Sequence, residues 1–248
     1  MSELLFNELP RPTFRWLRVN HTPASLLGES EETKSVLVKG NDAIISELPT
    51  GTALINPNYK GANDVALTQL VNSAEGYAVH VPANANEIVG IRIDAGARIA
   101  SRFQFIVEEG ANLEVQFFLD GGLANTTNVQ YFNEYDVKAN AKVVVKKVNL
   151  LDDTIQHIEH RYTKLEDNAD VEYINVEIGG KESSAQTAHS YRQRSHLAPK
   201  LSLQRTDRLY RKKRWENSHL VCWQHLFYFL GQMQEISLLC KDNFLKKR

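Results

Sequence analysis

Gly96-Ala97-Arg98-Ile99 is the first of four similar phrases in the middle of this chain, each made of a small turn residue, an alanine, any residue and an aliphatic residue. The others are Gly110-Ala111-Asn112-Leu113, Asn140-Ala141-Lys142-Val143 and Asn168-Ala169-Asp170-Val171, with starts 14, 30 and 28 residues apart. Repetition of this kind is typical of proteins built from stacked structural units. A turn about every 14 residues, two to a coil, predicts coils within the roughly 20–50 residues of known repeat folds.

Alternating strands surround these phrases. Gly and Asn adopt the left-handed turn conformation that other residues avoid, and the aliphatic residue begins the inward-facing set of the next strand. Apolar and polar residues then alternate, as in a strand with one face in a core. The apolar sets are Phe103, Phe105 and Val107; Leu113, Val115, Phe117 and Leu119; and Val143 and Val145. The pattern favours an all-β fold, a β-solenoid of stacked coils, over the alternative of an ordinary β-sandwich.

Three regions follow along the chain. Residues 1–75 predict a lead-in with short strands at 36–38 and 43–45 and one helix at 63–74, which Asn63 or Asp64 would cap. Residues 76–203 form the predicted β-helix core, and residues 204–248 form an atypical tail. No proline falls between Pro82 and Pro199, which suits uninterrupted strand pairing.

The tail differs from the body in charge and composition. Residues 205–248 contain ten Lys and Arg against four Asp and Glu, whereas the other 204 residues contain 19 against 26, and an acidic body argues against a nucleic-acid groove. The run Arg211-Lys212-Lys213-Arg214 resembles a nucleic-acid or nuclear-address patch, but four basic residues alone are weak evidence for one. Residues 215–239 are too polar for a bilayer span. Cys222 and Cys240 fit no metal or redox spacing. The first twelve residues contain no apolar stretch of signal-peptide length, so we expect a cytoplasmic protein.

Several stretches resemble the SufB/SufD family, the scaffold subunits of the Suf iron–sulfur cluster assembly machinery. Residues 67–82, Leu-Thr-Gln-Leu-Val-Asn-Ser-Ala-Glu-Gly-Tyr-Ala-Val-His-Val-Pro, resemble that family's entry from a short helix into a strand. Asp94-Ala95-Gly96-Ala97 and residues 190–199 fit as well, and residues 6–12 are similar to the lead-in of the SufD branch. The resemblance covers roughly residues 5–200. It implies a right-handed parallel β-helix, a SufB-like partner and the ATPase SufC.

The chain departs from this family near its end. Family members continue with further coils and a helical segment that docks on SufC, whereas here the strand pattern fails near Leu201-Ser202-Leu203. Residues 205–248 resemble nothing in the family, which predicts a truncation or a frame shift after about residue 200, or a tail that caps the solenoid. The family's cluster-building and docking residues lie in the missing part. We therefore assign no catalytic residue and no metal ligand, leave cofactor-binding residues open, and expect an iron–sulfur cluster only at the level of the complex.

Three groups of side chains invite a chemical interpretation. His157-Ile158-Glu159-His160 has two imidazoles, but the segment 154–163 looks like a strand, whose residues three apart face opposite sides, so we predict a solvated edge rather than a metal site. His189 and His196 lie beside Arg192 and Arg194 and could border a ligand or a subunit interface, although surface polarity is the commoner explanation. The acidic pairs are Glu108-Glu109, Asp152-Asp153 and Glu166-Asp167, which we expect to be solvated turn residues.

The resemblance implies a non-catalytic scaffold that pairs with a SufB-like subunit and a SufC-like ATPase, or with a second copy of itself. It contains neither a GxxxxGK[ST] loop nor GxGxxG nor HExxH. The main alternative is a β-helix carbohydrate-active enzyme, a polysaccharide lyase or hydrolase with acidic or basic residues along a groove. A stand-alone acidic interaction module is the third interpretation.

Overall fold

A computed structural model of the chain describes residues 4–6, 22–24, 36–61, 64–94, 99–121, 128–152, 154–180, 182–191 and 196–204. The chain divides into two units, Met1–Gln204 and Arg205–Arg248, and all described residues belong to the first. The predictions for residues 205–248, including both cysteines, therefore lie outside the described residues. Among the described residues, no helix is long and apolar enough to cross a membrane.

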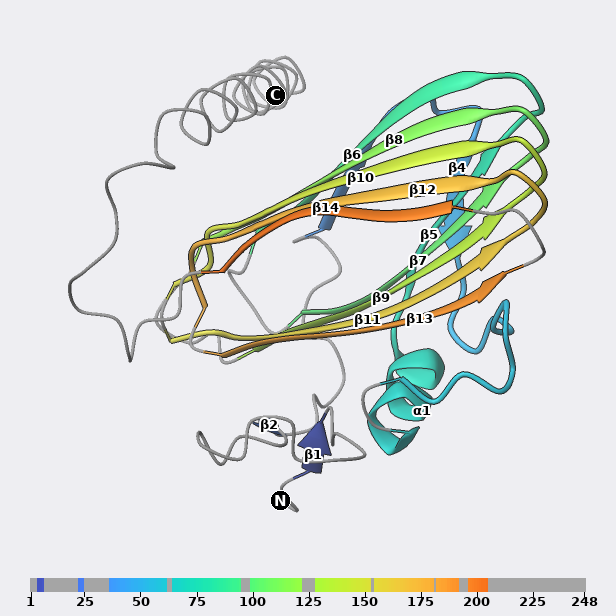
Figure 1. Cartoon of the computed structure of the whole chain (residues 1–248). Helices are drawn as coiled ribbons and strands as arrows, with labels where there is room; N and C mark the ends of the chain where they lie inside the picture. Colours follow the sequence, from blue (N-terminus) through green and yellow to red (C-terminus); the bar gives the residue numbers. More distant parts are fainter. Residues whose placement is uncertain are drawn as a thin grey trace, which may run out of the picture. The chain divides into compact units, whose positions relative to one another are not determined.

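Two six-stranded sheets build the first unit (Figure 1). Their strand orders are β14-β12-β10-β8-β6-β3 and β13-β11-β9-β7-β5-β4. From β5 and β6 onward all neighbours are parallel, so the chain alternates between the sheets and advances one strand position per coil. This is a parallel β-helix, as predicted, and the antiparallel β-sandwich is excluded.

The strands of the coils have the following bounds: β5 (Gly76–Val81), β6 (Asn86–Asp94), β7 (Ile99–Val107), β8 (Asn112–Asp120), β9 (Asn128–Val137), β10 (Lys142–Asn149), β11 (Gln156–Leu165), β12 (Asp170–Glu177), β13 (Glu182–Tyr191) and β14 (His196–Gln204). At the N-terminal end, β3 (Val36–Lys39) and β4 (Ile45–Leu48) close the sheets by antiparallel pairing with β6 and β5. A separate antiparallel pair joins β1 (Leu4–Phe6) and β2 (Thr22–Ala24). The predicted strand at 43–45 starts only at Ile45 because the amide of Ile44 bonds to the Asn41 carbonyl in a turn, 3.1 Å.

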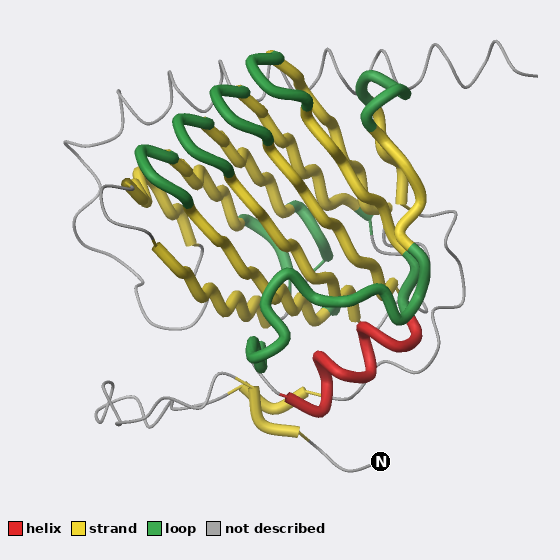
Figure 2. Tube along the Cα trace, turned by 90° about the vertical axis from the view of Figure 1, so that its right-hand side faces the viewer, coloured by secondary structure: helices red, strands yellow, loops and turns green. Residues whose placement is uncertain are grey.

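The strand register gives the coil length. Asn86, Asn112, Lys142 and Asp170 pair in succession, so the coils step by 26, 30 and 28 residues. Two residues before each of these positions, one residue has a left-handed backbone: Asn84 (φ 60°), Gly110 (φ 69°), Asn140 (φ 60°) and Asn168 (φ 58°). Figure 2 shows the turns of successive coils as a row of similar loops.

Three of the four repeated phrases therefore occupy one corner of successive coils. Gly96 lies among residues 95–98, outside the described residues. The structure adds a member that the pattern missed, Asn84-Ala85-Asn86-Glu87, in which glutamate replaces the aliphatic residue.

The strand pattern extends further than the sequence indicated. β14 continues to Gln204 and pairs with β12, but its register shifts between Tyr173 and Ile174. Tyr173 pairs with Pro199 and Ile174 with Leu201, so Lys200 is the extra residue of a bulge. Because one extra residue inverts the alternation, the sequence reads as a broken strand at this point.

Helix α1 (Asp64–Ser73) confirms the predicted helix and covers the outer face of the sheet that contains β7 and β9 (Figure 1). The same face buries a second apolar cluster, made of Tyr59, Leu67, Leu70, Ala74, Ala100, Phe132 and Tyr162. The entry into the first coil is tight, because a Cβ on Gly76 would lie 1.7 Å from the carbonyl oxygen of Arg102 in β7. Only glycine allows this approach of two strands.

A buried ionic network as the candidate functional site

The interior of the solenoid changes character along its axis. Between β5 and β8 it is apolar, with Phe103, Phe105 and Phe117 buried and their rings packed edge to face. Between β9 and β12 the inward positions also hold charged side chains. Four of these form the ionic network: Lys147, Glu159, Arg161 and Glu177.

Strand alternation places these charges inside. In β10 the residues Val143 and Val145 belong to the core cluster, and the same period of two brings Lys147 inward. In β11, Glu159 and Arg161 pair with Tyr131 and Asn133 of β9. The relative exposures of Lys147, Glu159 and Arg161 are 1%, 0% and 4%, so the network is removed from bulk solvent.

Glu159 is the centre of the network. Its Oε2 accepts from Lys147 Nζ at 2.7 Å and from the Tyr131 hydroxyl at 3.3 Å. Its Oε1 accepts from Arg161 Nε at 2.9 Å and from Asn133 Nδ2 at 3.1 Å. Two cations and two neutral donors thus surround one carboxylate, which compensates the cost of burying its charge.

Glu177 extends the network to the neighbouring strand β12. Lys147 Nζ lies 2.5 Å from Glu177 Oε1, so this ammonium bridges the two carboxylates across the core. Asn149 Nδ2 donates to Glu177 Oε2 at 2.7 Å. The guanidinium carbon of Arg161 lies 4.1 Å from the ring centroid of Tyr173, a cation–π contact.

His157 borders the network on the same inward face. Its Nε2 lies 3.1 Å from the Tyr131 hydroxyl, and its Nδ1 lies 3.4 Å from Asn149 Nδ2. Burial and the positive charge of Lys147 lower the pKa of His157 to about 4. The imidazole is therefore neutral at pH 7.

The electrostatics of the network are balanced. Burial alone raises the pKa of Glu159, but Arg161 and Lys147 outweigh it and hold this pKa well below the usual range. The pKa of Glu177 is also lowered, since Lys147 and neighbouring donors outweigh its burial. Burial opposes the charge of Arg161, yet Glu159 raises the pKa of this guanidinium. Two cations and two anions remain, so the network is a neutral cross-link between the two sheets.

A second buried ion pair lies on the outer face of the sheet. Arg102 Nη2 and Glu134 Oε2 are 2.9 Å apart, and each side chain is 1% exposed. Arg102 also donates to the Thr52 carbonyl at 2.8 Å, and Glu134 accepts from the Ile55 amide at 2.8 Å. Burial raises the pKa of Glu134 despite these donors. This pair ties the segment before α1 onto the coils.

The prediction of a solvated edge at residues 157–160 is wrong. His157, Glu159 and His160 are all 0% exposed. The two imidazoles do face opposite sides, as expected for a strand. His160 lies outside the coil, where its Nε2 is 3.0 Å from Gln130 Nε2 and its ring meets Phe132 edge to face. Burial lowers the pKa of His160 to about 4.

The network was not predicted because the alternation expected for β10 ended at Val145. The signal was present: two more residues of the same period place Lys147 and Asn149 on the inward side. In the part of the chain that the structure describes, no three His, Cys, Asp or Glu side chains are grouped so that they could hold a metal ion.

The other candidate residues are dispersed. Glu108 contacts His80 at 2.8 Å, and Glu166 lies 3.4 Å from Lys138, both near turns. Their neighbours Glu109 and Asp167 are exposed, as is Asp152, which agrees with solvated turn residues. Asp153, Arg192 and Arg194 lie outside the described residues. The structure describes His189 and His196 only as strand positions, in β13 and β14.

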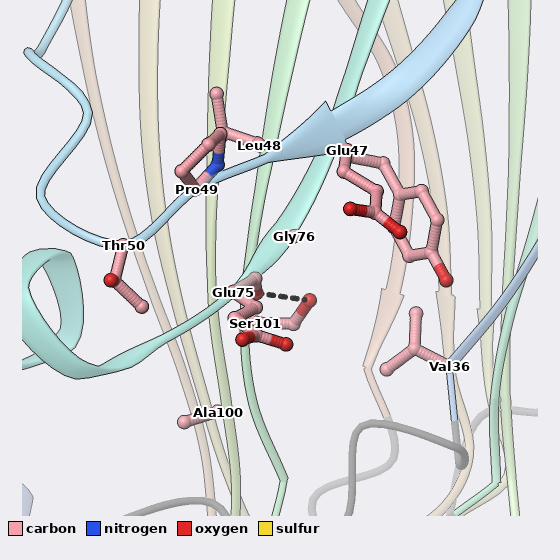
Figure 3. Close-up of a pocket in the computed structure, with 10 residues that line it drawn as sticks. Val36, Glu47, Leu48, Pro49, Thr50, Glu75, Gly76, Ala100 and Ser101 are labelled. Atoms are coloured by element: carbon pink, nitrogen blue, oxygen red, sulfur yellow. Dashed lines mark hydrogen bonds between the residues drawn. The ribbon is translucent and has the colours of Figure 1, made fainter.

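A groove of about 420 Å³ opens at the N-terminal end of the solenoid, where β4 meets β5 (Figure 3). The exposed residues Glu47 and Glu75 line it, together with Tyr77 and Ser101. The Ser101 hydroxyl donates to the carbonyl oxygen of Glu75 at 3.3 Å, the contact drawn in Figure 3. Two carboxylates at an open groove are the feature that the carbohydrate-enzyme interpretation requires.

Comparison with models of protein families gives a match over the coils. Residues 91–197 match the family model described as SUF system FeS cluster assembly, SufBD core domain. The matched segment runs from β6 into β14 and contains the whole ionic network. It supports the SufB/SufD family and a role in iron–sulfur cluster assembly. Neither the curated proteins nor the solved structures gave a match to this chain.

Proposed function

We propose that this chain is a non-catalytic scaffold subunit of the Suf system, of the SufD type, that works by pairing with a SufB-like subunit and a SufC-like ATPase. The observation that carries the proposal is the match of residues 91–197 to the SufBD core domain. A parallel β-helix supports it, because a solenoid offers long faces and terminal strand edges to other subunits. An iron–sulfur cluster enters the proposal as the cargo of the complex.

The C-terminal strands are the suggested contact with the SufB-like subunit. β13 and β14 are the last strands of their sheets, and in the described part of the chain no strand pairs with their outer edges. Such edges present amides and carbonyls that a partner strand can bind. At the other end, the antiparallel strands β3 and β4 close the sheets.

The state of the buried charges supports a structural role. Each of the four charges in the ionic network contacts an opposite charge inside the coil. A general acid or base needs a titratable group within hydrogen-bond reach of a substrate. The ionic network instead joins the two sheets. Its role in the scaffold would be to hold the coils together mechanically.

Co-purification tests the proposal. The tagged full chain is co-expressed with a SufB-like subunit and a SufC-like ATPase, and the stoichiometry of the isolated complex is measured. We expect a stable complex that contains all three proteins. If the folded chain does not co-purify with one or the other of these partners, the scaffold function is contradicted. Turnover of uronic-acid polymers by the isolated chain would favour the carbohydrate enzyme, and Glu47→Gln with Glu75→Gln would then abolish it.

Adjacent proline substitutions test the edge contact separately. The amides of neighbouring residues in a strand point to opposite sides. Of the two variants Ser184→Pro and Ala185→Pro in β13, one therefore removes a hydrogen bond to β11, and the other removes a donor on the outer edge. We expect one variant to lose stability and the other to fold but lose the SufB-like partner. If both folded variants bind equally, the edge is not the contact, although the scaffold function would stand.

A further inference from the structure

Three buried polar atoms near the ionic network have no hydrogen-bond partner among the residues that the structure describes: Asn133 Oδ1, Tyr135 Oη and Asn175 Oδ1. Asn133 and Tyr135 are both 0% exposed. A buried polar atom without a partner costs about 1–3 kcal/mol, so native proteins rarely leave three of them in one place.

The register brings these atoms into adjacent layers of one interior. Asn133 and Tyr135 lie two residues apart on β9, where they pair with Arg161 and Thr163 of β11. Asn175 belongs to the facing sheet and pairs with Lys147. The ring of Tyr135 lies 6.1 Å from that of Tyr173, two residues from Asn175, which confirms that the two strands meet here.

The orientation of the Asn133 amide is fixed. Its Nδ2 donates to Glu159 Oε1 at 3.1 Å, and the flipped amide would place its oxygen against that carboxylate. Asn133 Oδ1 therefore remains an acceptor that needs a donor. With Asn175 Oδ1 and the Tyr135 hydroxyl, the site offers two acceptors and one group that donates.

We propose that one or more ordered water molecules occupy a polar chamber bounded by Asn133, Tyr135 and Asn175. A water molecule donates two hydrogen bonds and accepts others, so ordered water can donate to the amide oxygens and receive the Tyr135 O–H. A neutral ligand fits better than an ion, because the adjacent cations and carboxylates already compensate one another. The chamber water thereby extends the hydrogen bonds of the ionic network between the sheets.

One side of the chamber is accessible to water. Asn175 is partly exposed although its Oδ1 is buried, and Glu177 is 8% exposed, so the chamber lies close to solvent.

A high-resolution crystal structure of the full chain tests the proposal directly. We expect water density within about 2.6–3.2 Å of Asn133 Oδ1 and Tyr135 Oη. A well-ordered interior in which these atoms contact only protein carbon, or bond to other protein groups, overturns it. Density for a metal or another ion at this position overturns it as well.

A pair of tyrosine substitutions gives an independent test by urea unfolding. The reference is Tyr173→Phe, which removes a hydroxyl paired with Thr163 Oγ1 at 2.6 Å. If water binds Tyr135 Oη, Tyr135→Phe raises the unfolding equilibrium constant by roughly two- to tenfold, as the loss of one hydrogen bond does. The water site is contradicted if Tyr173→Phe loses stability as expected but the unfolding equilibrium constant of Tyr135→Phe is unchanged or smaller. The Tyr135 hydroxyl would then have no hydrogen-bond partner.

Discussion

The two halves of the solenoid interior have the same backbone arrangement but are filled by different kinds of side chain. Between β5 and β8 the coil is filled by aromatic and aliphatic side chains such as Phe103, Phe105 and Phe117. Between β9 and β12 the same inward positions also hold the ionic network around Glu159. In both halves the corner is formed by a Gly or Asn residue with a left-handed backbone. Backbone pairing and turns therefore set the coil, and the interior can vary while the coil persists.

The difference has an energetic consequence. Burial of apolar surface stabilises the folded state by roughly 25 cal/mol for each Å² removed from water, whichever apolar side chain it packs against. A buried ion pair contributes little net stability over an apolar replacement of similar volume, but the loss of one partner is costly. We infer that the apolar half contributes most of the stability and that the ionic half contributes most of the sensitivity to single substitutions.

Removal of the central carboxylate should have the largest effect. Glu159→Gln keeps the volume but leaves Lys147 and Arg161 with Glu177 as the remaining carboxylate of the network. We expect a loss of about 3–5 kcal/mol in the free energy of unfolding, measured by urea denaturation at pH 7.

Replacement of the entire network is the control for this prediction. A variant with Lys147→Met, Glu159→Leu, Arg161→Met and Glu177→Leu removes all four charges at similar volume. It should be clearly more stable than Glu159→Gln alone. A Glu159→Gln variant within 1 kcal/mol of the unmodified chain would contradict the balanced network.

Acid should destabilise the chain before the carboxylates titrate. The pKa values of His157 and His160 are about 4 in the fold, below the ordinary value of 6.5, so the unfolded chain binds more protons as the pH falls through this window. Stability from these neutral imidazoles is present above pH 6.5 and is lost toward pH 4. Each histidine should contribute a loss on the order of 2 kcal/mol between pH 7 and pH 5, since one unit of pKa is about 1.4 kcal/mol.

The two histidines can be separated by substitution. His157→Gln and His160→Gln should each remove part of the slope of stability against pH between 6.5 and 4. Below about pH 4.5 the lowered pKa values of Glu159 and Glu177 add a further loss, because these carboxylates become protonated more readily in the unfolded chain. A pH slope unchanged in both variants would show that the imidazoles are not buried as described.

The sequence predicted the repeating parts of the molecule and missed the part that differs. Period-two alternation and the turns at Gly110, Asn140 and Asn168 were sufficient for the solenoid, because both signals are local. The ionic network was not predicted, since a charge in a strand is by default assigned to the solvated face. Glu159 was placed on a solvated edge for this reason. Alternation can place each of these residues on an inward face, but only the folded structure shows that Lys147, Arg161 and Glu177 meet around Glu159.

A truncation in the apolar half should have a moderate effect that is independent of pH. Val115 is 0% exposed and lies in register with Val89 and Val145. Val115→Ala removes two methyl groups and leaves a small cavity, so we expect a loss of about 2 kcal/mol. The loss should be equal at pH 7 and pH 5.5. A loss that grows with acidity would mean that the two interiors are energetically coupled and that the division into halves is wrong.

The turns that the two halves share should give the smallest effect. Asn140 has a φ of 60°, which alanine adopts at a cost of about 1 kcal/mol and glycine adopts freely. Asn140→Ala and Asn140→Gly both remove the exposed contact in which Asn168 Nδ2 donates to Asn140 Oδ1 at 3.2 Å, so their difference isolates the backbone conformation. We expect Asn140→Ala to unfold at a lower urea concentration than Asn140→Gly. Equal midpoints would mean that the left-handed corner is not what fixes the coil, and the interiors themselves would then have to set the 26–30-residue repeat.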